Sequence, residues 1–130
     1  FQYKLRTVPE NVKNGEDISV SVDVTNTGNM DGDEVVQLYV SLPDSKLQKP
    51  IRALQGFKRV HLKKDETQTV KFTLKPHQIA ARNKENIPVV ETGKVQVSIG
   101  GKQPDANLLV AGKAVEAFIE TEGDNYFINE

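Results

Sequence analysis

The side chains that most often carry metal or acid–base chemistry are few in this sequence and stand apart from one another. The chain has two histidines, His61 and His77, and no cysteine. A zinc site needs three or four converging ligands, and no second imidazole stands at ligand spacing from either histidine. His61 lies between Val60 and Leu62 in an alternating segment, which favours a side chain that faces solvent. The sequence therefore predicts no zinc site.

Three carboxylates, Asp31, Asp33 and Glu34, crowd one predicted turn and resemble a fragment of a calcium-binding loop. The further oxygen ligands that an EF-hand supplies at fixed spacing are missing, so solvated turn carboxylates are the preferred interpretation. The sequence also contains neither a Gly-x-Ser-x-Gly turn nor a glycine-rich loop ahead of a helix. We therefore expect no catalytic residue, no bound metal and no cofactor.

Aromatic rings are the remaining candidates, because sugar-binding modules stack pyranose rings on exposed Trp or Tyr. The chain has no Trp and three tyrosines, Tyr3, Tyr39 and Tyr126. The five phenylalanines are expected to be core residues, Phe72 because of its alternating segment and Phe57 because it follows a bend at Gly56. The aromatic content of 6% leaves little material for a sugar platform.

Tyr39 belongs to an outward-facing set on the segment from Glu34 to Leu42. Val35, Gln37 and Tyr39 share one side of this segment, opposite the apolar residues Val36, Leu38 and Val40. An outer face that carries Val and Tyr is more apolar than a solvated antiparallel sheet normally shows. We predict that Val35, Gln37 and Tyr39 form an interdomain face, with Tyr39 partly covered by the chain's own segment 78–90 and the cover completed by the partner. A sugar platform at Tyr39 is the alternative.

Composition limits the class of protein. The chain has 130 residues, which suits one domain, and its 17 basic and 18 acidic residues are interspersed with a net charge of −1. Nucleic acid and anionic membrane surfaces are bound through a basic stripe, so neither is expected as a partner. The longest apolar runs are only a few residues, too short to cross a bilayer. The chain begins with Phe1 and no leader, as an excised piece of a longer protein would.

Hydrophobic alternation with a period of two recurs along the chain and predicts β-strands. The clearest strand is 18–24, and others are expected over 1–5, over 34–42, over 51–62 with a bulge at Gly56, and over 70–74. A short helical turn is expected over 77–83, and further strands over 95–99 and 108–119. Seven or eight short strands separated by turn signals predict an all-β, two-sheet antiparallel sandwich. The sandwich is expected to span 1–119, with a polar tail over 120–130 that frays or follows a partner domain.

The alternation also predicts the core. The apolar side of each strand should lie between the two sheets. Seven residues are predicted to be buried on this basis: Val22, Val36, Leu38, Val40, Val70, Phe72 and Val97.

Three segments in order carry a family resemblance. They read VDVTNTG at 22–28, GDEVVQLYVSLP at 32–43 and KPIRALQGFKRVHLKKDETQTVKFTL at 49–74, and a glycine turn and hairpin follow over 90–101. Together they resemble the fibronectin type III-like domain that ends many family 3 glycoside hydrolases, over residues 17–101. Two places depart from the family pattern: 78–83 lacks an aromatic residue, and 91–93 reads Glu-Thr-Gly where Glu-Pro-Gly is usual.

The resemblance implies an immunoglobulin-like or fibronectin type III-like sandwich with an accessory role. It implies a parent enzyme of the retaining β-glucosidase or β-xylosidase type, in which a catalytic barrel and a second sandwich domain of the same chain do the chemistry and are this domain's partners. No acid of this chain matches the catalytic motifs, so no catalytic residue is carried over. The resemblance also implies a secreted or periplasmic parent. An independent carbohydrate-binding module with polysaccharide as a partner, and a cell-surface immunoglobulin-like spacer, remain the alternatives.

Overall fold

The computed structural model describes residues 1–47, 53–101, 109 and 112–128, and this part of the chain is all-β. Pro50 and the predicted strand starts at Ile51 and Leu108 lie outside the described residues. The strands are β1 (Gln2–Thr7), β2 (Asn11–Lys13), β3 (Ile18–Thr25), β4 (Gly32–Ser41), β5 (Ala53–Leu62), β6 (Thr67–Leu74), β7 (Ala81–Arg82), β8 (Pro88–Val90), β9 (Lys94–Gly100), β10 (Ala114–Glu122) and β11 (Tyr126–Phe127). The helical turn expected over 77–83 is a 3₁₀ helix, η1 (Pro76–Ile79), and β7 follows it.

The strands form three sheets within the described residues, where two were expected. Their orders are β1-β3-β6, β2-β10-β9-β4-β5 and β11-β8-β7. The described residues form seven strands of six to ten residues and four strands of two or three residues. One pairing also differs from the expected antiparallel pattern, because β2 pairs with β10 in parallel. The sheet β1-β3-β6 is hereafter called the three-stranded sheet, and β11-β8-β7 the small sheet. The first segment of the chain therefore changes sheets, with β1 in the three-stranded sheet and β2 in the five-stranded sheet.

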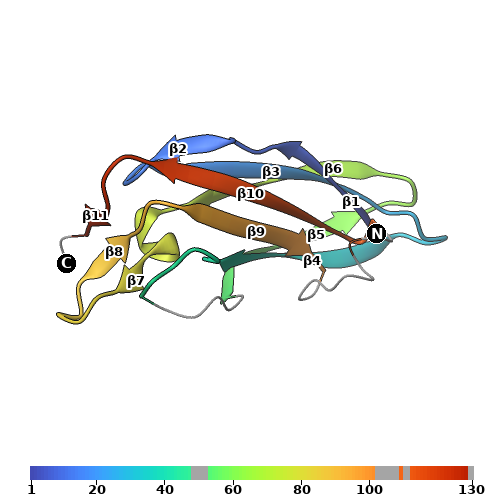
Figure 1. The fold of residues 1–130 in the computed structure, drawn as a ribbon. Helices are drawn as coiled ribbons and strands as arrows, with labels where there is room; N and C mark the ends of the chain where they lie inside the picture. Colours follow the sequence, from blue (N-terminus) through green and yellow to red (C-terminus); the bar gives the residue numbers. More distant parts are fainter. Residues whose placement is uncertain (48–52, 102–108, 110–111, 129–130) are drawn as a thin grey trace.

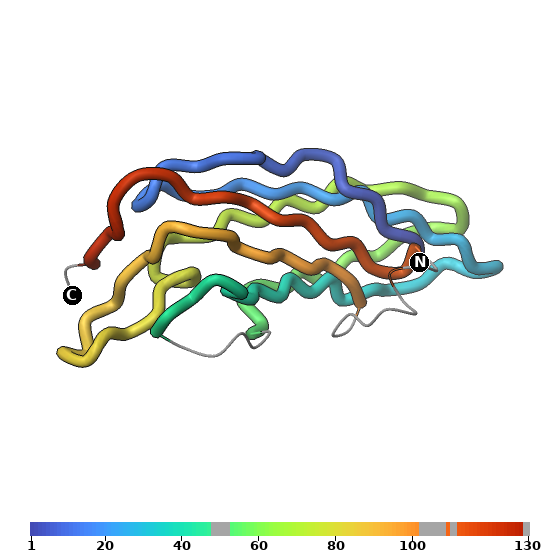
Figure 2. Tube along the Cα trace, viewed as in Figure 1, coloured from blue at the N-terminus to red at the C-terminus, as the bar shows by residue number. Residues whose placement is uncertain are grey.

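The molecule is elongated along the strand direction. The chain begins at one end, and β7, β8 and β11 lie at the opposite end (Figures 1 and 2). The three-stranded and five-stranded sheets contribute to one hydrophobic cluster, which includes Val20 and Val22 from β3 as well as Leu38 from β4 and Ile99 from β9. The inner side of each sheet is hereafter the side that carries these core residues, and the outer side is the opposite one.

The core prediction is confirmed at all seven positions. Val22, Val36 and Leu38 are 0% exposed, and the most exposed of the set, Phe72, reaches 7%. Gly56 lies opposite the Phe72 ring, since a Cβ at Gly56 would stand 3.1 Å from Phe72 Cδ1. The predicted bulge is also present: Gly56 pairs with Leu38 and Leu54 with Tyr39, which leaves Gln55 as an extra residue in β5.

Within the Thr-Asn-Thr-Gly motif, Asn26 has a structural role: its side chain is buried, with 2% of the residue exposed. Its Nδ2 donates to Met30 O at 2.9 Å and to Leu62 O at 3.0 Å, and its Oδ1 accepts from Gly28 N at 2.9 Å. One buried amide therefore closes its own turn and joins it to the end of β5. Because a buried amide must be hydrogen-bonded, a side chain without both donor and acceptor would not serve here.

The polar segment expected to form a tail is tied to sheets in its described part. Glu120–Glu122 continue β10 and pair with Asn11–Lys13, and Tyr126–Phe127 pair with Val90 and Val89 of β8. Polar side chains misled the expectation because backbone hydrogen bonds, not side chains, make these pairs. Within the described ranges, no helix has the length and apolar character that crossing a bilayer requires.

Candidate functional site: the outer face of the five-stranded sheet

The outer side of β4 carries the three residues predicted for an interdomain face. Val36, Leu38 and Val40 of the same strand are buried, so the alternation turns Val35, Gln37 and Tyr39 outward. Val35 is 38% exposed, and Gln37 and Tyr39 are half-buried. The Tyr39 hydroxyl donates to Gln37 Oε1 at 2.6 Å. This hydrogen bond satisfies the Tyr39 hydroxyl and the Gln37 carbonyl oxygen, so the Tyr39 ring remains available as contact surface.

The neighbouring strand β5 enlarges this apolar surface. Phe57 pairs with Gln37 and Leu54 with Tyr39 across the β4–β5 ladder, so both point outward. Phe57 is 68% exposed and Leu54 is 49% exposed. We define the outer β4–β5 face as Val35, Gln37, Tyr39, Leu54 and Phe57.

The prediction that the phenylalanines are core residues is wrong for three of the five. Phe57, Phe118 and Phe127 are exposed, and only Phe72 is buried. The sequence held the signal for Phe57: counting back by twos from the buried Leu62 places Lys58 and Gly56 inward and Phe57 outward. Lys58 on the inner side has its ammonium 5.6 Å from the Phe72 ring centre, an arrangement that keeps its charge at the sheet edge.

A charged cluster borders the outer β4–β5 face at its Gly32–Leu62 end. Asp33 pairs with His61 across the ladder, and His61 Nδ1 lies 2.5 Å from Asp33 Oδ1. Arg59, opposite Val35, donates to Asp33 Oδ2 at 3.1 Å. The hydrogen bonds from His61 and then Arg59 hold the pKa of the Asp33 carboxyl below its usual value. The outer face is thus apolar in its middle and charged at one end.

The three carboxylates considered for calcium point to different partners. Asp31 Oδ1 accepts from the Lys64 amide at 2.9 Å, Asp33 contacts His61 and Arg59, and Glu34 Oε2 accepts from the Tyr3 hydroxyl at 3.0 Å. Their oxygens do not converge. Among the described residues, no group of three or more His, Cys, Asp or Glu side chains could hold a metal ion.

The two other tyrosines are not on the outer β4–β5 face. Tyr3 is 5% exposed, and its phenol bridges β1 to β4 through Glu34. Burial, followed by the charge of Glu34 and the hydrogen bond to it, raises the pKa of Tyr3 well above its usual range. Tyr126 is 44% exposed and packs against Gly15 at the far end of the molecule. The three rings therefore do not form a common platform.

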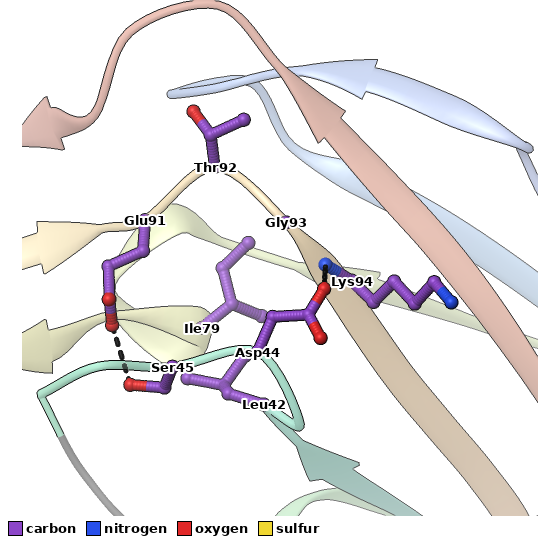
Figure 3. A pocket seen from close by; sticks show the side chains of 8 residues that line it. All are labelled: Leu42, Asp44, Ser45, Ile79, Glu91, Thr92, Gly93 and Lys94. Carbon is purple, nitrogen blue, oxygen red and sulfur yellow. Dashed lines mark hydrogen bonds between the residues drawn. The ribbon is translucent and has the colours of Figure 1, made fainter.

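A small pocket lies between the end of β4 and the turn that joins β8 to β9 (Figure 3). Ser45 Oγ donates to Glu91 Oε1 at 2.6 Å, and the Lys46 amide donates to Glu91 Oε2 at 2.9 Å. The Lys94 amide donates to Asp44 Oδ2 at 3.1 Å. Both carboxylates are therefore occupied in holding the segment after β4 against the β8–β9 turn. The pocket is a structural junction and offers no paired acid and base.

The fold and sequence match one family over more than half of the chain. The fibronectin type III-like domain matches residues 34–103. A β-xylosidase of Formosa agariphila is 39% identical over 75% of this chain, and thermostable β-glucosidase B of Acetivibrio thermocellus is 37% identical over 81%. Among solved structures, a β-glucosidase from Listeria innocua covers 95% of the chain at 25% identity with a TM-score of 0.82, and one from Kluyveromyces marxianus covers 98% at 32% identity with a TM-score of 0.77.

The chain belongs to the fibronectin type III-like domain family, which confirms the resemblance seen in its sequence motifs. It spans 14% of the length of each of these two curated relatives and 16% and 14% of the two solved chains. These glycosidases therefore each contain one region like this chain within a much longer protein.

Proposed function

We propose that this chain is a non-catalytic accessory domain of a larger β-glucosidase or β-xylosidase, secreted or periplasmic, and that its two larger sheets form the sandwich. The observation that carries the proposal is the match of almost the whole chain to a small part of such enzymes. The described carboxylates support it, because each candidate among Asp31, Asp33, Glu34, Asp44 and Glu91 already accepts hydrogen bonds from the fold. Glycoside hydrolysis requires two carboxyl groups facing one another across the scissile bond.

The outer β4–β5 face is proposed as the surface that docks on the rest of the parent chain. Phe57, Leu54 and Val35 are exposed, and Tyr39 adds its ring between them. Exposed aromatic side chains gathered on one sheet face are typical of an interface core, and the Asp33–His61–Arg59 cluster supplies a polar rim. The relatives' length outside this region supplies the body on which the face would dock.

The test is Tyr39→Ala in the full-length parent, followed by thermal melting and steady-state kinetics on small aryl glycosides. We expect a lower melting temperature and an unchanged KM, because interface area is lost while the substrate site is untouched. Met30→Ala is the matched control, since Met30 is an exposed apolar residue in the turn before β4, outside the defined face. A raised KM with an unshifted melting temperature would contradict docking and favour a sugar platform at Tyr39.

A second measurement separates docking from independent sugar binding. The isolated 130-residue chain should neither hydrolyse aryl glycosides nor retain β-linked oligosaccharides in affinity electrophoresis. Retention that Tyr39→Ala and Phe57→Ala both abolish would support the carbohydrate-binding alternative. Tandem copies of the same domain in the native gene, with no glycosidase body, would support the spacer alternative.

A further inference from the structure

The turn between β2 and β3 contains the dipeptide Asn14-Gly15, and the Asn14 side chain holds three segments together. Its Nδ2 donates to Thr92 Oγ1 at 2.7 Å and to Asp124 O at 2.8 Å, with Val90 O at 3.4 Å. The Asn14 backbone amide also donates to the carbonyl of Glu122 at 2.9 Å. One amide thus joins the β2–β3 turn, the β8–β9 turn and the segment that follows β10.

The segment from Gly123 to Ile128, here called the C-terminal strap, is closed over this turn. Thr92 donates its amide to Asn125 Oδ1 at 2.9 Å and its hydroxyl to Gly123 O. The Tyr126 ring lies against Gly15, whose φ is +91°, and a Cβ there would stand 2.7 Å from Tyr126 Cδ2. Glycine therefore satisfies both the left-handed backbone and the close approach of the ring.

Besides these contacts, the Ile128 amide of the strap donates to Pro88 O at 2.9 Å. Its own strand, β11, contributes two residue pairs with β8. Segments with few backbone pairs and exposed side chains open with a small part of the global unfolding free energy. Tyr126 and Phe127 are both about half exposed, so the apolar surface newly exposed by opening the strap is mainly that of Ile128, which packs against the core. Opening frees the Asn14 amide from Asp124 and breaks the bonds between Thr92 and the strap.

Asn followed by Gly is the dipeptide in which side-chain cyclisation is least hindered, because glycine has no Cβ beside the attacking nitrogen. In this reaction the Gly15 nitrogen bonds to Asn14 Cγ, the Cγ–Nδ2 bond breaks, and the proton from the Gly15 nitrogen leaves with Nδ2 as ammonia. Water then opens the succinimide ring at either carbonyl, giving aspartate or isoaspartate at position 14. Water is the only co-reactant, and no oxidation or reduction occurs.

We propose that Asn14 is a deamidation site controlled by the C-terminal strap: the closed strap holds the amide and protects it, and the open strap exposes it to cyclisation. The product cannot restore the closed state. A carboxylate at position 14 has no hydrogen to donate, and it would face Thr92 Oγ1, Val90 O and Asp124 O, of which the two carbonyls are acceptors only. Asn14 Oδ1 is already enclosed without a partner among the described residues, so the second oxygen adds to the unsatisfied buried acceptors.

The experiment follows deamidation at Asn14 by peptide mapping and mass spectrometry of the full-length protein at mildly alkaline pH. Thr92→Val removes the hydroxyl that accepts from the Asn14 amide and donates to Gly123 O of the strap. It keeps the Asn14-Gly15 dipeptide unchanged. We expect a rate about five-fold above wild type, which corresponds to the loss of about 1 kcal/mol of closing free energy. Thr69→Val is the matched control, because Thr69 donates to Asp23 on the three-stranded sheet and is remote from the strap; its rate should equal that of wild type.

Two further variants keep the proposal testable if Thr92→Val is poorly folded. Asn125→Ala releases the Thr92 amide from the strap without touching an Asn14 partner, and it should also raise the rate. Asn14→Asp should increase hydrogen exchange of residues 123–128 several-fold and leave β3 and β6 unchanged. The proposal is overturned if folded wild type deamidates at Asn14 as fast as the urea-unfolded chain, if both strap variants keep the wild-type rate, or if Asn14→Asp leaves strap exchange unchanged.

Discussion

The outer sides of the two larger sheets differ although the same period-two alternation builds both. On the three-stranded sheet the outer residues are polar throughout the β3–β6 ladder: Ser19, Ser21, Asp23 and Thr25 face Thr73, Lys71, Thr69 and Thr67. On the five-stranded sheet the outer β4–β5 face carries Val35, Tyr39, Leu54 and Phe57. Polar outer residues are the norm for an antiparallel sheet in water. The departure on one side is the observation on which the proposed docking surface rests.

The hydrogen bonds of the outer β4–β5 face and of the outer side of the β3–β6 ladder differ in the same way. Across the three-stranded sheet, Thr25 bonds to Thr67 at 2.8 Å, and Asp23 accepts from Thr69 at 2.7 Å and pairs with Arg6 at 3.4 Å. On the outer β4–β5 face the Tyr39–Gln37 bond stays within one strand. A polar face satisfied by its own cross-strand pairs needs no partner, whereas exposed Phe57 and Leu54 gain from being covered.

The largest effect should come from Phe72, whose position contrasts with that of Phe57. Phe72→Ala removes a ring that is 7% exposed and packed against Gly56, so we expect a loss of about 3–5 kcal/mol in the free energy of unfolding. Urea denaturation of the isolated chain measures it. A loss below about 1 kcal/mol would mean that the inner side of β6 has been assigned incorrectly.

The effect of Phe57→Ala should differ between the isolated chain and the full-length enzyme, which sharpens the comparison. In the isolated chain the ring is 68% exposed, and the change in unfolding free energy should stay within about 0.5 kcal/mol. In the full-length enzyme, covering the ring should make the same change cost about 1.5–3 kcal/mol. Denaturation of both proteins, monitored on this domain by hydrogen exchange, gives the two values. Equal small losses in both would contradict docking through this face.

Tyr3→Phe tests the joint between the two sheets. The variant keeps the ring and removes the hydrogen bond to Glu34 Oε2, with an expected loss of about 1.5 kcal/mol in the free energy of unfolding. The raised pKa of Tyr3 also makes the free energy of unfolding depend on pH. The phenol's contribution is complete below its unfolded pKa of about 10 and is lost as pH rises above it, because the unfolded state then deprotonates first.

The pH arm of this prediction has an internal control. Wild-type unfolding free energy should fall more steeply above pH 10 than that of Tyr3→Phe, measured by urea titration at a series of pH values. Parallel curves for the two proteins would show that Tyr3 titrates in the folded state as it does in the unfolded one.

The smallest effect concerns the charged border of the outer face. Because the pKa of Asp33 is lowered, its pairing with His61 and Arg59 stabilises the folded state above the usual carboxyl pKa of about 4. This stabilisation is lost as pH falls through the lowered pKa. Carboxyl carbon NMR should show Asp33 titrating below that usual value, and His61→Ala should raise its pKa more than Arg59→Ala does. The reverse order would make Arg59 the dominant partner.

The strand phases were predictable because each depends on neighbouring residues alone. Val20, Val22 and Val24 alternate with Ser and Asp, and all three are buried. The position of Phe57 was missed because the expectation followed the bend at Gly56 and not the alternation that continues through Val60 and Leu62. The contacts of Asn14 could not be predicted, since its partners Thr92 and Asp124 stand far along the chain. Such pairings need the tertiary structure.

The outer β4–β5 face was therefore half predictable. Val35, Gln37 and Tyr39 follow from one strand's pattern, whereas Leu54 and Phe57 join them through the ladder and its extra residue at Gln55. The parallel β2–β10 pair and the third sheet were missed for the same reason, because nothing local specifies which distant segment a three-residue strand will meet.

The parallel pairing of β2 with β10 has a consequence for the order in which the strands can pair during synthesis. Asn11–Lys13 find their partners only at Glu120–Glu122, so a ribosome must add over a hundred residues before this ladder can close. β3 and β6 pair over a shorter span and can form while synthesis continues. Contacts between residues so distant along the chain carry a large loop-closure entropy and are slow to form. We therefore expect the nascent domain to assemble around β3–β6 and to seal its first and last segments together at the end.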